Sequence, residues 1–280
     1  MTDLAAVSTA EPFFLKNGSG QRFCMFHKPV GACRGAVLYV HPFAEELNRS
    51  RRMAALQARQ LAALGYGVLQ IDLYGCGDSS GDFGDARWQL WKDDLEDGAA
   101  WLRQHLGQPL TLWGLRLGAT LALDFARATT ETVHKMILWQ PVLNASTYLT
   151  QFLRLRMASA LLTDTASEQS GTSALRASLR RGEILEIGGY QLAPGMAAAL
   201  DALEVFDAPP PAFPVHWLET INASGQGVPA AAARVHAEWQ RQGAKLTVHA
   251  VPCPPFWATP EITVCPGWLD ATSAAIQASR

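Results

Sequence analysis

The chain has 280 residues, of which 49% are hydrophobic and 17% charged, and its formal net charge is −2. These values are typical of one large α/β domain, alone or with an insertion. The small net charge argues against nucleic acid as a partner, because phosphate binding needs a clustered basic surface. No apolar run approaches the roughly 20 residues that span a bilayer, and the first residues lack the pattern of a secretory signal. We therefore expect no transmembrane segment and a cytoplasmic location.

The cysteines are five in number and scattered, at Cys24, Cys33, Cys76, Cys253 and Cys265. An odd number without CxxC spacing predicts reduced thiols rather than a disulfide framework or a zinc site. The histidines show no H-x-H or HExxH spacing, so no metal or other cofactor is expected.

The N-terminal half alternates strand and helix patterns. Residues 13–17 and 22–30 flank "GSGQ" and predict an antiparallel hairpin. Further strands are predicted at 35–43, 67–75, 109–114 and 134–142, and helices at 50–66, 87–107 and 117–129. Ser50 is expected to cap the first of these helices and Gly65 to end it. Short connections between alternating elements predict a mainly parallel sheet with helices on both faces.

The alternation stops at about residue 143 and resumes at about 213. Residues 144–162 and 173–192 carry helical patterns, separated by a polar link at 163–173, and "APPPAFP" closes the segment. Strands at 215–219 and 245–251 and helices at 229–242 and 267–279 then follow. We therefore predict a core of residues 1–142 and 213–280 and a cap of residues 143–212.

The stretch "TLWGLRLGATLAL", residues 111–123, predicts a strand, a tight turn and a helix. This is the layout of the G-x-S-x-G nucleophile elbow of α/β-hydrolases. "HPF" at 41–43 follows a buried strand, and "DLYGCGDSSG" at 72–81 follows the next. The ordered set, with a cap after the elbow, resembles the α/β-hydrolase superfamily across nearly the whole chain.

The stretches "HPFAEELNRSRRM", "DLYGCGDSSGDF", "LWGLRLGATLAL" and "PPFWATPEIT" are more specific. Together they resemble the second type of the exosortase A system-associated hydrolase family. The resemblance implies a place in bacteria that export proteins with PEP-CTERM sorting signals and make exopolysaccharide. Its implied partners are other proteins of that system.

The residues expected of a catalytic triad are missing. Arg116 occupies the elbow position, and its guanidinium stays protonated and has no lone pair to offer as a nucleophile. The loop "TINASGQGVP", where the acid is expected, contains no acid, and Glu219 just before it is the only nearby candidate. The loop "PCPPFW" contains no histidine. Because the three groups act as a unit, we expect a degenerate triad and a binding or accessory role.

An unconventional ester or thioester hydrolase is the alternative. Cys253 lies where the triad histidine is expected, and a Cys253–His41 pair is chemically sensible. Ser79, in the loop after the second parallel strand, is a weaker candidate nucleophile. Packed structural roles compete with catalysis for all three residues.

An anion site at the elbow is the other hypothesis. The backbone N–H groups of Leu117 and Phe43 are expected to point into the cleft as an oxyanion-hole-like pair. Arg116 adds a permanent cation beside a helix N-terminus, which favours a carboxylate, a phosphate or an acidic glycan group. His41 is expected to line this cleft. An internal ion pair of Arg116 with Glu45, Glu46 or Glu219 competes with the anion.

Overall fold

The central sheet contains eight strands in the order β1-β2-β4-β3-β5-β6-β9-β10. The computed structural model describes residues 9–162, 171–221 and 227–278. The strands are β1 (Ala10–Asn17), β2 (Gly20–His27), β3 (Gly35–Val40), β4 (Tyr66–Ile71), β5 (Leu110–Leu115), β6 (Val133–Trp139), β9 (Val215–Ile221) and β10 (Leu246–Pro252). The β1–β2 hairpin pairs antiparallel with β4, and the other pairs are parallel.

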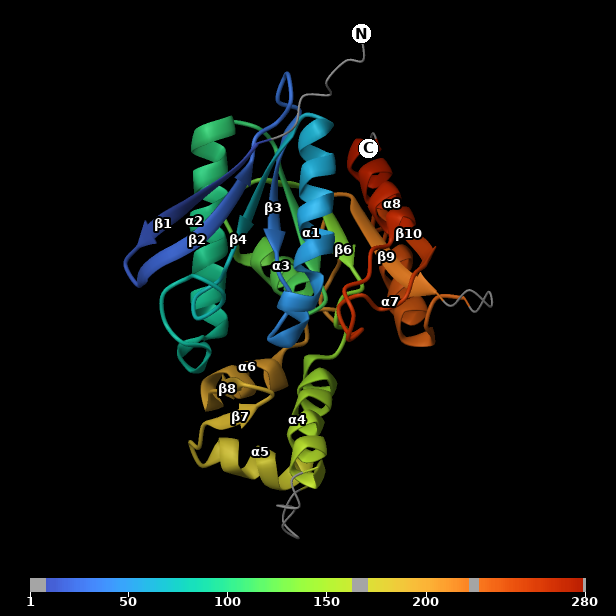
Figure 1. Cartoon of the computed structure of the whole chain (residues 1–280). Helices are drawn as coiled ribbons and strands as arrows, with labels where there is room; N and C mark the ends of the chain where they lie inside the picture. The colour runs from blue at the N-terminus through green and yellow to red at the C-terminus, as the bar shows by residue number, and fades with distance from the viewer. Residues whose placement is uncertain (1–8, 163–170, 222–226, 279–280) are drawn as a thin grey trace.

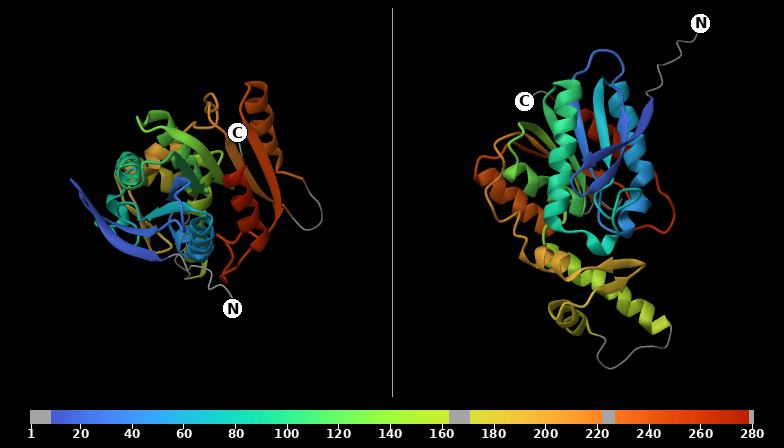
Figure 2. Two further views of the ribbon diagram at one scale, coloured as in Figure 1. Left: turned by 90° about the horizontal axis from the view of Figure 1, so that it is seen from above. Right: turned by 90° about the vertical axis from the view of Figure 1, so that its left-hand side faces the viewer.

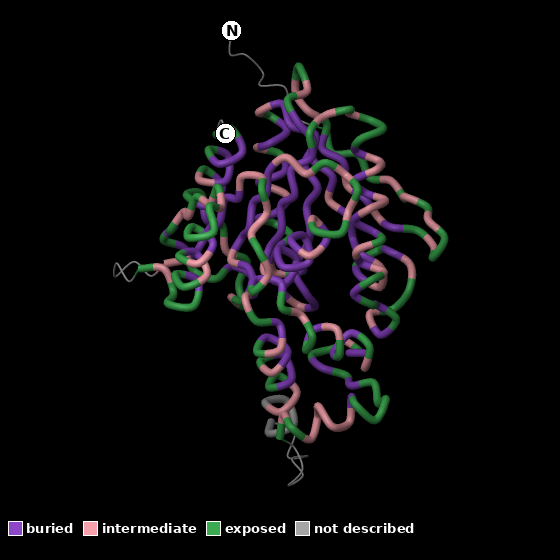
Figure 3. The backbone as a smooth tube through the Cα atoms, turned by 180° about the vertical axis from the view of Figure 1, so that it is seen from behind, coloured by how far each residue is buried: buried purple, intermediate pink, exposed green. Residues whose placement is uncertain are grey.

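Helices cover both faces of the sheet (Figures 1 and 2). One face carries α1 (Glu45–Ala63) and α8 (Pro266–Gln277); the other carries α2 (Trp88–Leu106), α3 (Leu117–Ala128) and α7 (Ala230–Arg241). The strands between them are buried on both sides, as Figure 3 shows at the centre of the molecule. The predicted stripe of Trp88, Trp91 and Leu95 lies in this core. The α/β fold predicted from the alternation is confirmed.

Helix α1 begins earlier than the sequence predicted. Ala44 has a φ of 49°, and the helix starts at the next residue. Ser50 therefore lies inside α1, where its hydroxyl donates to Glu46 O at 2.8 Å. The prediction that Ser50 caps the helix is wrong, because a buried serine can bond the carbonyl one turn back equally well.

The segment between β6 and β9 lies beyond the carboxyl ends of the parallel strands (Figure 1). It contains α4 (Ala145–Leu162), α5 (Thr172–Arg180), β7 (Leu185–Ile187), β8 (Tyr190–Leu192) and α6 (Pro194–Ala202). The helical pattern predicted over 173–192 ends at Arg180, and Gly182, with a φ of 96°, follows the end of α5. Gly188 and Gly189 also take positive φ and turn the β7–β8 hairpin. Most of the predicted link at 163–173 lies outside the described residues. The predicted core and cap boundaries remain a prediction.

Two cysteines that the sequence predicted to be reduced form a disulfide. Cys253 and Cys265 are joined, with Cα atoms 6.1 Å apart, between β10 and α8. Cys24, Cys33 and Cys76 are free. Disulfides persist mainly in oxidising compartments. The Cys253–Cys265 pair therefore means that the cysteines no longer support a cytoplasmic location. Within the described ranges, no helix is long and apolar enough to cross a membrane.

Candidate functional site

The turn at Arg116 has the backbone geometry of a nucleophile elbow. Strand β5 ends at Leu115, α3 begins at Leu117, and Arg116 between them has φ 55° and ψ −123°. Its N–H donates to Trp139 O at 2.9 Å. A Cβ at Gly114 would lie 2.5 Å from Ala119 Cα. A Cβ at Gly118 would collide with the backbone carbonyl of His41. The two glycines therefore allow the close packing that this turn needs.

The Arg116 guanidinium is held by groups from four parts of the chain. Its Nε donates to Glu46 Oε1 of α1 at 3.3 Å, and Nη1 to Gln140 O at 3.4 Å. Its central carbon lies 5.3 Å from the ring centroid of Trp257 and 5.7 Å from that of Tyr148. Both distances are within the range of cation–π attraction. The side chain remains 18% exposed.

Glu46 is the acid that the structure places against Arg116. Burial raises the pKa of Glu46 to about 7, although Arg116 acts to lower it. Of the other two acids considered, Glu219 accepts from Trp217 Nε1 at 2.7 Å, and burial raises its pKa as well. Glu45 forms no ion pair with any residue that the structure describes. The internal pair expected for Arg116 therefore exists, and Glu46 is the partner.

His41 is buried and both of its ring nitrogens are occupied. Nδ1 donates to Pro42 O at 2.8 Å, and Leu73 N–H donates to Nε2 at 3.2 Å. These two bonds fix the neutral form with the proton on Nδ1, and burial lowers the pKa of His41 further. No nitrogen is left to accept a proton from a nucleophile. The expectation that His41 acts as a catalytic base is therefore wrong for this structure.

The two candidate nucleophiles are also committed elsewhere. Ser79 Oγ accepts from Phe23 N–H at 2.9 Å and donates to Asp72 O at 2.5 Å, which fastens its loop to β2. Cys253 is in the disulfide and has no thiolate to offer. The expected Cys253–His41 pair is thus wrong, and Ser79 has a structural role.

The positions for a triad acid and histidine follow β9 and β10. Glu219 lies inside β9, one strand position before Thr220, and is buried. Part of the loop after β9, residues 222–226, lies outside the described residues. After β10 comes the disulfide-closed segment, which brings Trp257 over Arg116. The sequence did not predict the contact of Tyr148 with Arg116, because nothing in the pattern of α4 relates that tyrosine to the elbow.

A small cleft with polar and apolar side chains lies beside Arg116. Its volume is about 180 Å³, and Asn144, Thr147 and Gln151 line it together with Arg116 and Tyr148. The oxyanion-hole-like roles of the Phe43 and Leu117 N–H groups remain predictions. Across the described ranges, no cluster of three or more His, Cys, Asp or Glu side chains is arranged to hold a metal ion.

The strand order, the elbow after β5 and the helices on both faces define a class. The chain has the α/β-hydrolase fold. Within that class it belongs to the serine aminopeptidase S33 family, whose model matches residues 31–180, more than half of the chain. No curated protein sequence matches the chain.

Solved structures of hydrolases share the fold. Est1E from Butyrivibrio proteoclasticus, bound to ferulic acid, has a TM-score of 0.65 and 15% identity, over 95% of this chain and 96% of that one. A putative hydrolase from Agrobacterium vitis S4 has a TM-score of 0.62 and 17% identity, over 96% and 98%. A thermostable carboxyl esterase from Bacillus coagulans, in complex with glycerol, has a TM-score of 0.59 and 14% identity, over 87% and 90%. At these identities the likeness concerns the fold alone.

Proposed function

We propose that this chain is a hydrolase-fold protein that binds an acidic group at the elbow and does not form an acyl-enzyme there. The ligand group is a carboxylate, a phosphate or the acidic group of a glycan. The observation that carries the proposal is the Arg116 guanidinium, which takes the place of the nucleophile in an intact elbow turn. An arginine there supplies a forked, permanent cation at the start of α3.

The surroundings of Arg116 support binding over acyl transfer. Acyl transfer needs a nucleophile and a base within hydrogen-bond reach of each other. His41 gives both ring nitrogens to the backbone, and Cys253 is oxidised. Binding needs only a cation that a ligand can reach, and Arg116 borders the small cleft with Asn144 and Thr147.

In this proposal, the incoming anion replaces Glu46 as the partner of Arg116. Glu46 holds Arg116 through one contact of 3.3 Å, which is longer than the usual charge-assisted bond. An incoming anion with two oxygens would pair with the guanidinium more fully and displace Glu46. The displaced carboxyl would then take up a proton, because its buried surroundings disfavour the charged form.

The setting that we propose is the bacterial exosortase and exopolysaccharide system. Support comes from the four sequence stretches that resemble the exosortase A system-associated hydrolases, including "DLYGCGDSSGDF" and "PPFWATPEIT". The ligand would then be a small acidic molecule or an acidic group on another protein of that system.

A thermal-shift panel tests the anion site. Inorganic phosphate, succinate and glucuronate are added to the wild type, to Arg116→Gln and to Arg154→Gln, a control at an exposed arginine of α4. We expect at least one anion to raise the melting temperature of the wild type and of Arg154→Gln and not that of Arg116→Gln. If every anion stabilises Arg116→Gln as much as the wild type, the site is not at the elbow.

An ester or thioester hydrolase is the competing function. Membership of a hydrolase family and structural likeness to esterases support it. Ser79 keeps a hydroxyl that can act as a nucleophile, whereas Cys253 is oxidised, but this hydroxyl would have to leave Phe23 N–H and Asp72 O to attack a substrate. Ser79→Ala separates the two functions, because turnover that depends on this hydroxyl would be lost in the variant.

A further inference from the structure

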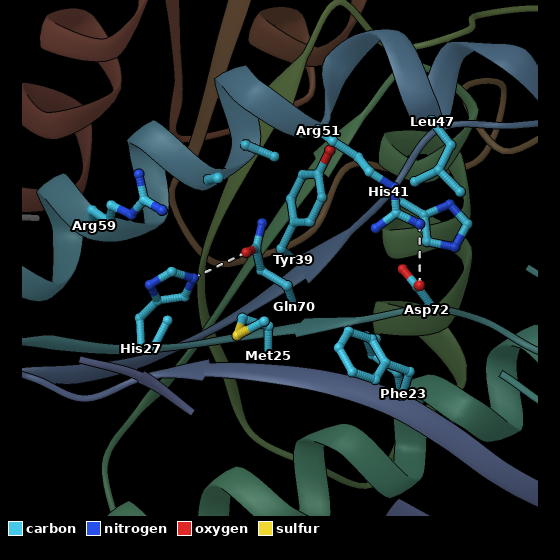
Figure 4. A pocket seen from close by; sticks show the side chains of 14 residues that line it. Phe23, Met25, His27, Tyr39, His41, Leu47, Arg51, Arg59, Gln70 and Asp72 are labelled. Carbon is cyan, nitrogen blue, oxygen red and sulfur yellow. Dashed lines mark hydrogen bonds and ion pairs between the residues drawn. The ribbon is translucent and has the colours of Figure 1, made fainter. Parts of the chain in front are cut away.

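A second cavity lies between α1 and the strands β2, β3 and β4, away from Arg116. Its volume is about 220 Å³. The β2 side chains Phe23, Met25 and His27 alternate onto one face of the strand and form its floor (Figure 4). The register places Gln70 of β4 opposite both Met25 and Tyr39, so these side chains share that face.

His27 is a buried polar group with one side unused. The residue is 2% exposed, and its Nε2 lies 3.0 Å from Gln70 Oε1, while its Nδ1 has no hydrogen-bond partner among the described residues. Buried polar atoms are nearly always bonded. With Gln70 Oε1 facing the ring, His27 Nε2–H is the donor of that bond and Nδ1 of the neutral ring is an acceptor. A 180° turn of the Gln70 amide keeps the bond with its direction reversed, moves the ring proton to Nδ1 and makes Nδ1 a donor to a ligand.

The charges that line the cavity do not cancel. Arg51 pairs with Asp72 at 3.1 Å. Arg59 lies about two turns after Arg51 on α1 and lines the same cavity. It forms no ion pair with a carboxylate in the described parts of the chain, and Figure 4 shows it above His27. His27 and His41 are held neutral by burial, which lowers the pKa of each. Two arginines and one carboxylate leave a net charge of +1, which is complementary to a monoanion.

We propose that this cavity binds a small apolar monocarboxylate, with its carboxylate at Arg59 and His27 and its apolar part against Phe23, Met25 and Tyr39. A cavity of about 150 Å³ lined by apolar side chains is large enough to bind benzene. The volume here therefore accommodates one aromatic ring with a carboxylate, and benzoate is the probe of that size. This site is separate from Arg116, and it stands whether or not the elbow binds an anion.

Isothermal titration calorimetry with benzoate and with neutral benzyl alcohol tests the proposal. We expect the wild type to bind benzoate more tightly than benzyl alcohol. Arg59→Gln should weaken benzoate binding about tenfold and leave benzyl alcohol unchanged, because only the charge-assisted contact is lost. Ala55→Phe, which fills the cavity from α1, should abolish binding of both.

Two controls keep the site assignment separate from other effects. Arg52→Gln removes a neighbouring exposed arginine of α1 that does not line the cavity, and should bind benzoate like the wild type. The titrations are repeated in an Arg116→Gln background, which removes the anion site proposed at the elbow, so that the effect of Arg59→Gln there reports this cavity alone. The proposal is overturned if benzoate does not bind the wild type, if it binds folded Ala55→Phe unchanged, or if Arg59→Gln and Arg52→Gln behave alike.

Discussion

The backbone of Arg116 has the strained conformation of a nucleophile elbow, although an arginine side chain cannot act as a nucleophile. A non-glycine residue in this sparsely populated region costs about 1–3 kcal/mol, which the contacts of the guanidinium with Glu46, Trp257 and Tyr148 help to offset. The same residue thus fixes the turn and contacts α1, α4 and the disulfide-closed segment at one point.

The Arg116–Glu46 pair predicts a pH dependence. Glu46 has a folded-state pKa of about 7, above its unfolded value. The folded state therefore binds more protons than the unfolded state between these values, and its stability rises as the pH falls through 7. We expect the free energy of unfolding to increase by about 1 kcal/mol more in the wild type than in Glu46→Gln between about pH 8 and about pH 6.

Urea denaturation of both proteins at the two pH values measures this difference. Titration of other groups, such as Asp94, is common to both proteins and cancels. Equal pH dependence in the wild type and in Glu46→Gln would show that Glu46 ionises as it does in the unfolded chain.

Residue roles were predictable only where the backbone fixes them. The elbow at Arg116 follows from the glycines on either side and from the strand–helix pattern. The roles of His41 and Ser79 did not follow, because their partners are backbone groups of Pro42, Leu73, Phe23 and Asp72, which are placed by tertiary packing. The choice of Glu46 over Glu45 depends on where α1 begins, and the sequence placed that start five residues late.

The segment between β10 and α8 depends on its disulfide. The disulfide joins Cys253 and Cys265, which are twelve positions apart. The segment that it closes contains Trp257, whose ring packs on the Arg116 guanidinium. Closing a loop of about this length stabilises a fold by about 3 kcal/mol in the chain-entropy account. We expect Cys265→Ser, or reduction of the wild type, to lower the free energy of unfolding by about 2–3 kcal/mol.

Chemical denaturation with and without a reducing agent tests that expectation. The control is Cys33→Ser, which removes a free, half-exposed thiol and should remain sensitive to reduction. Insensitivity of the wild type to reduction would mean that the two cysteines do not form a stabilising bond.

The β1–β2 hairpin is fastened to α2 by a buried ion pair. Arg22 of β2 and Asp94 of α2 are fully buried, with Nε and Oδ1 2.5 Å apart, and Tyr74 N–H donates to the other carboxylate oxygen at 2.7 Å. Removing one partner leaves a buried charge, so Asp94→Ala should cost about 3–5 kcal/mol. The double variant Arg22→Met/Asp94→Leu should cost less than Asp94→Ala alone, as measured by denaturation; a larger loss would contradict the account.

The fold of the whole molecule could be predicted from the alternation of strand and helix patterns and from the length of the chain. Continuous apolar strands with short connections to amphipathic helices leave few arrangements besides a parallel sheet covered on both faces. The disulfide did not follow, because two cysteines twelve positions apart meet only once β10 and α8 are in place. The β7–β8 hairpin was missed because its strands are three residues long, too short for periodicity, although the Gly188–Gly189 pair was a signal.

The central claim is that the elbow holds a cation for binding and not a nucleophile for acyl transfer. The most direct test is turnover of p-nitrophenyl esters, thioesters and aminoacyl p-nitroanilides, with intact-mass detection of a fluorophosphonate adduct. The wild type, Arg116→Gln, Ser79→Ala and His41→Gln are compared, each checked for folding by its melting temperature. We expect no adduct and no turnover above the solution rate in any of the four. A covalent adduct on the wild type, or turnover that a folded Ser79→Ala or His41→Gln variant loses, would contradict the account.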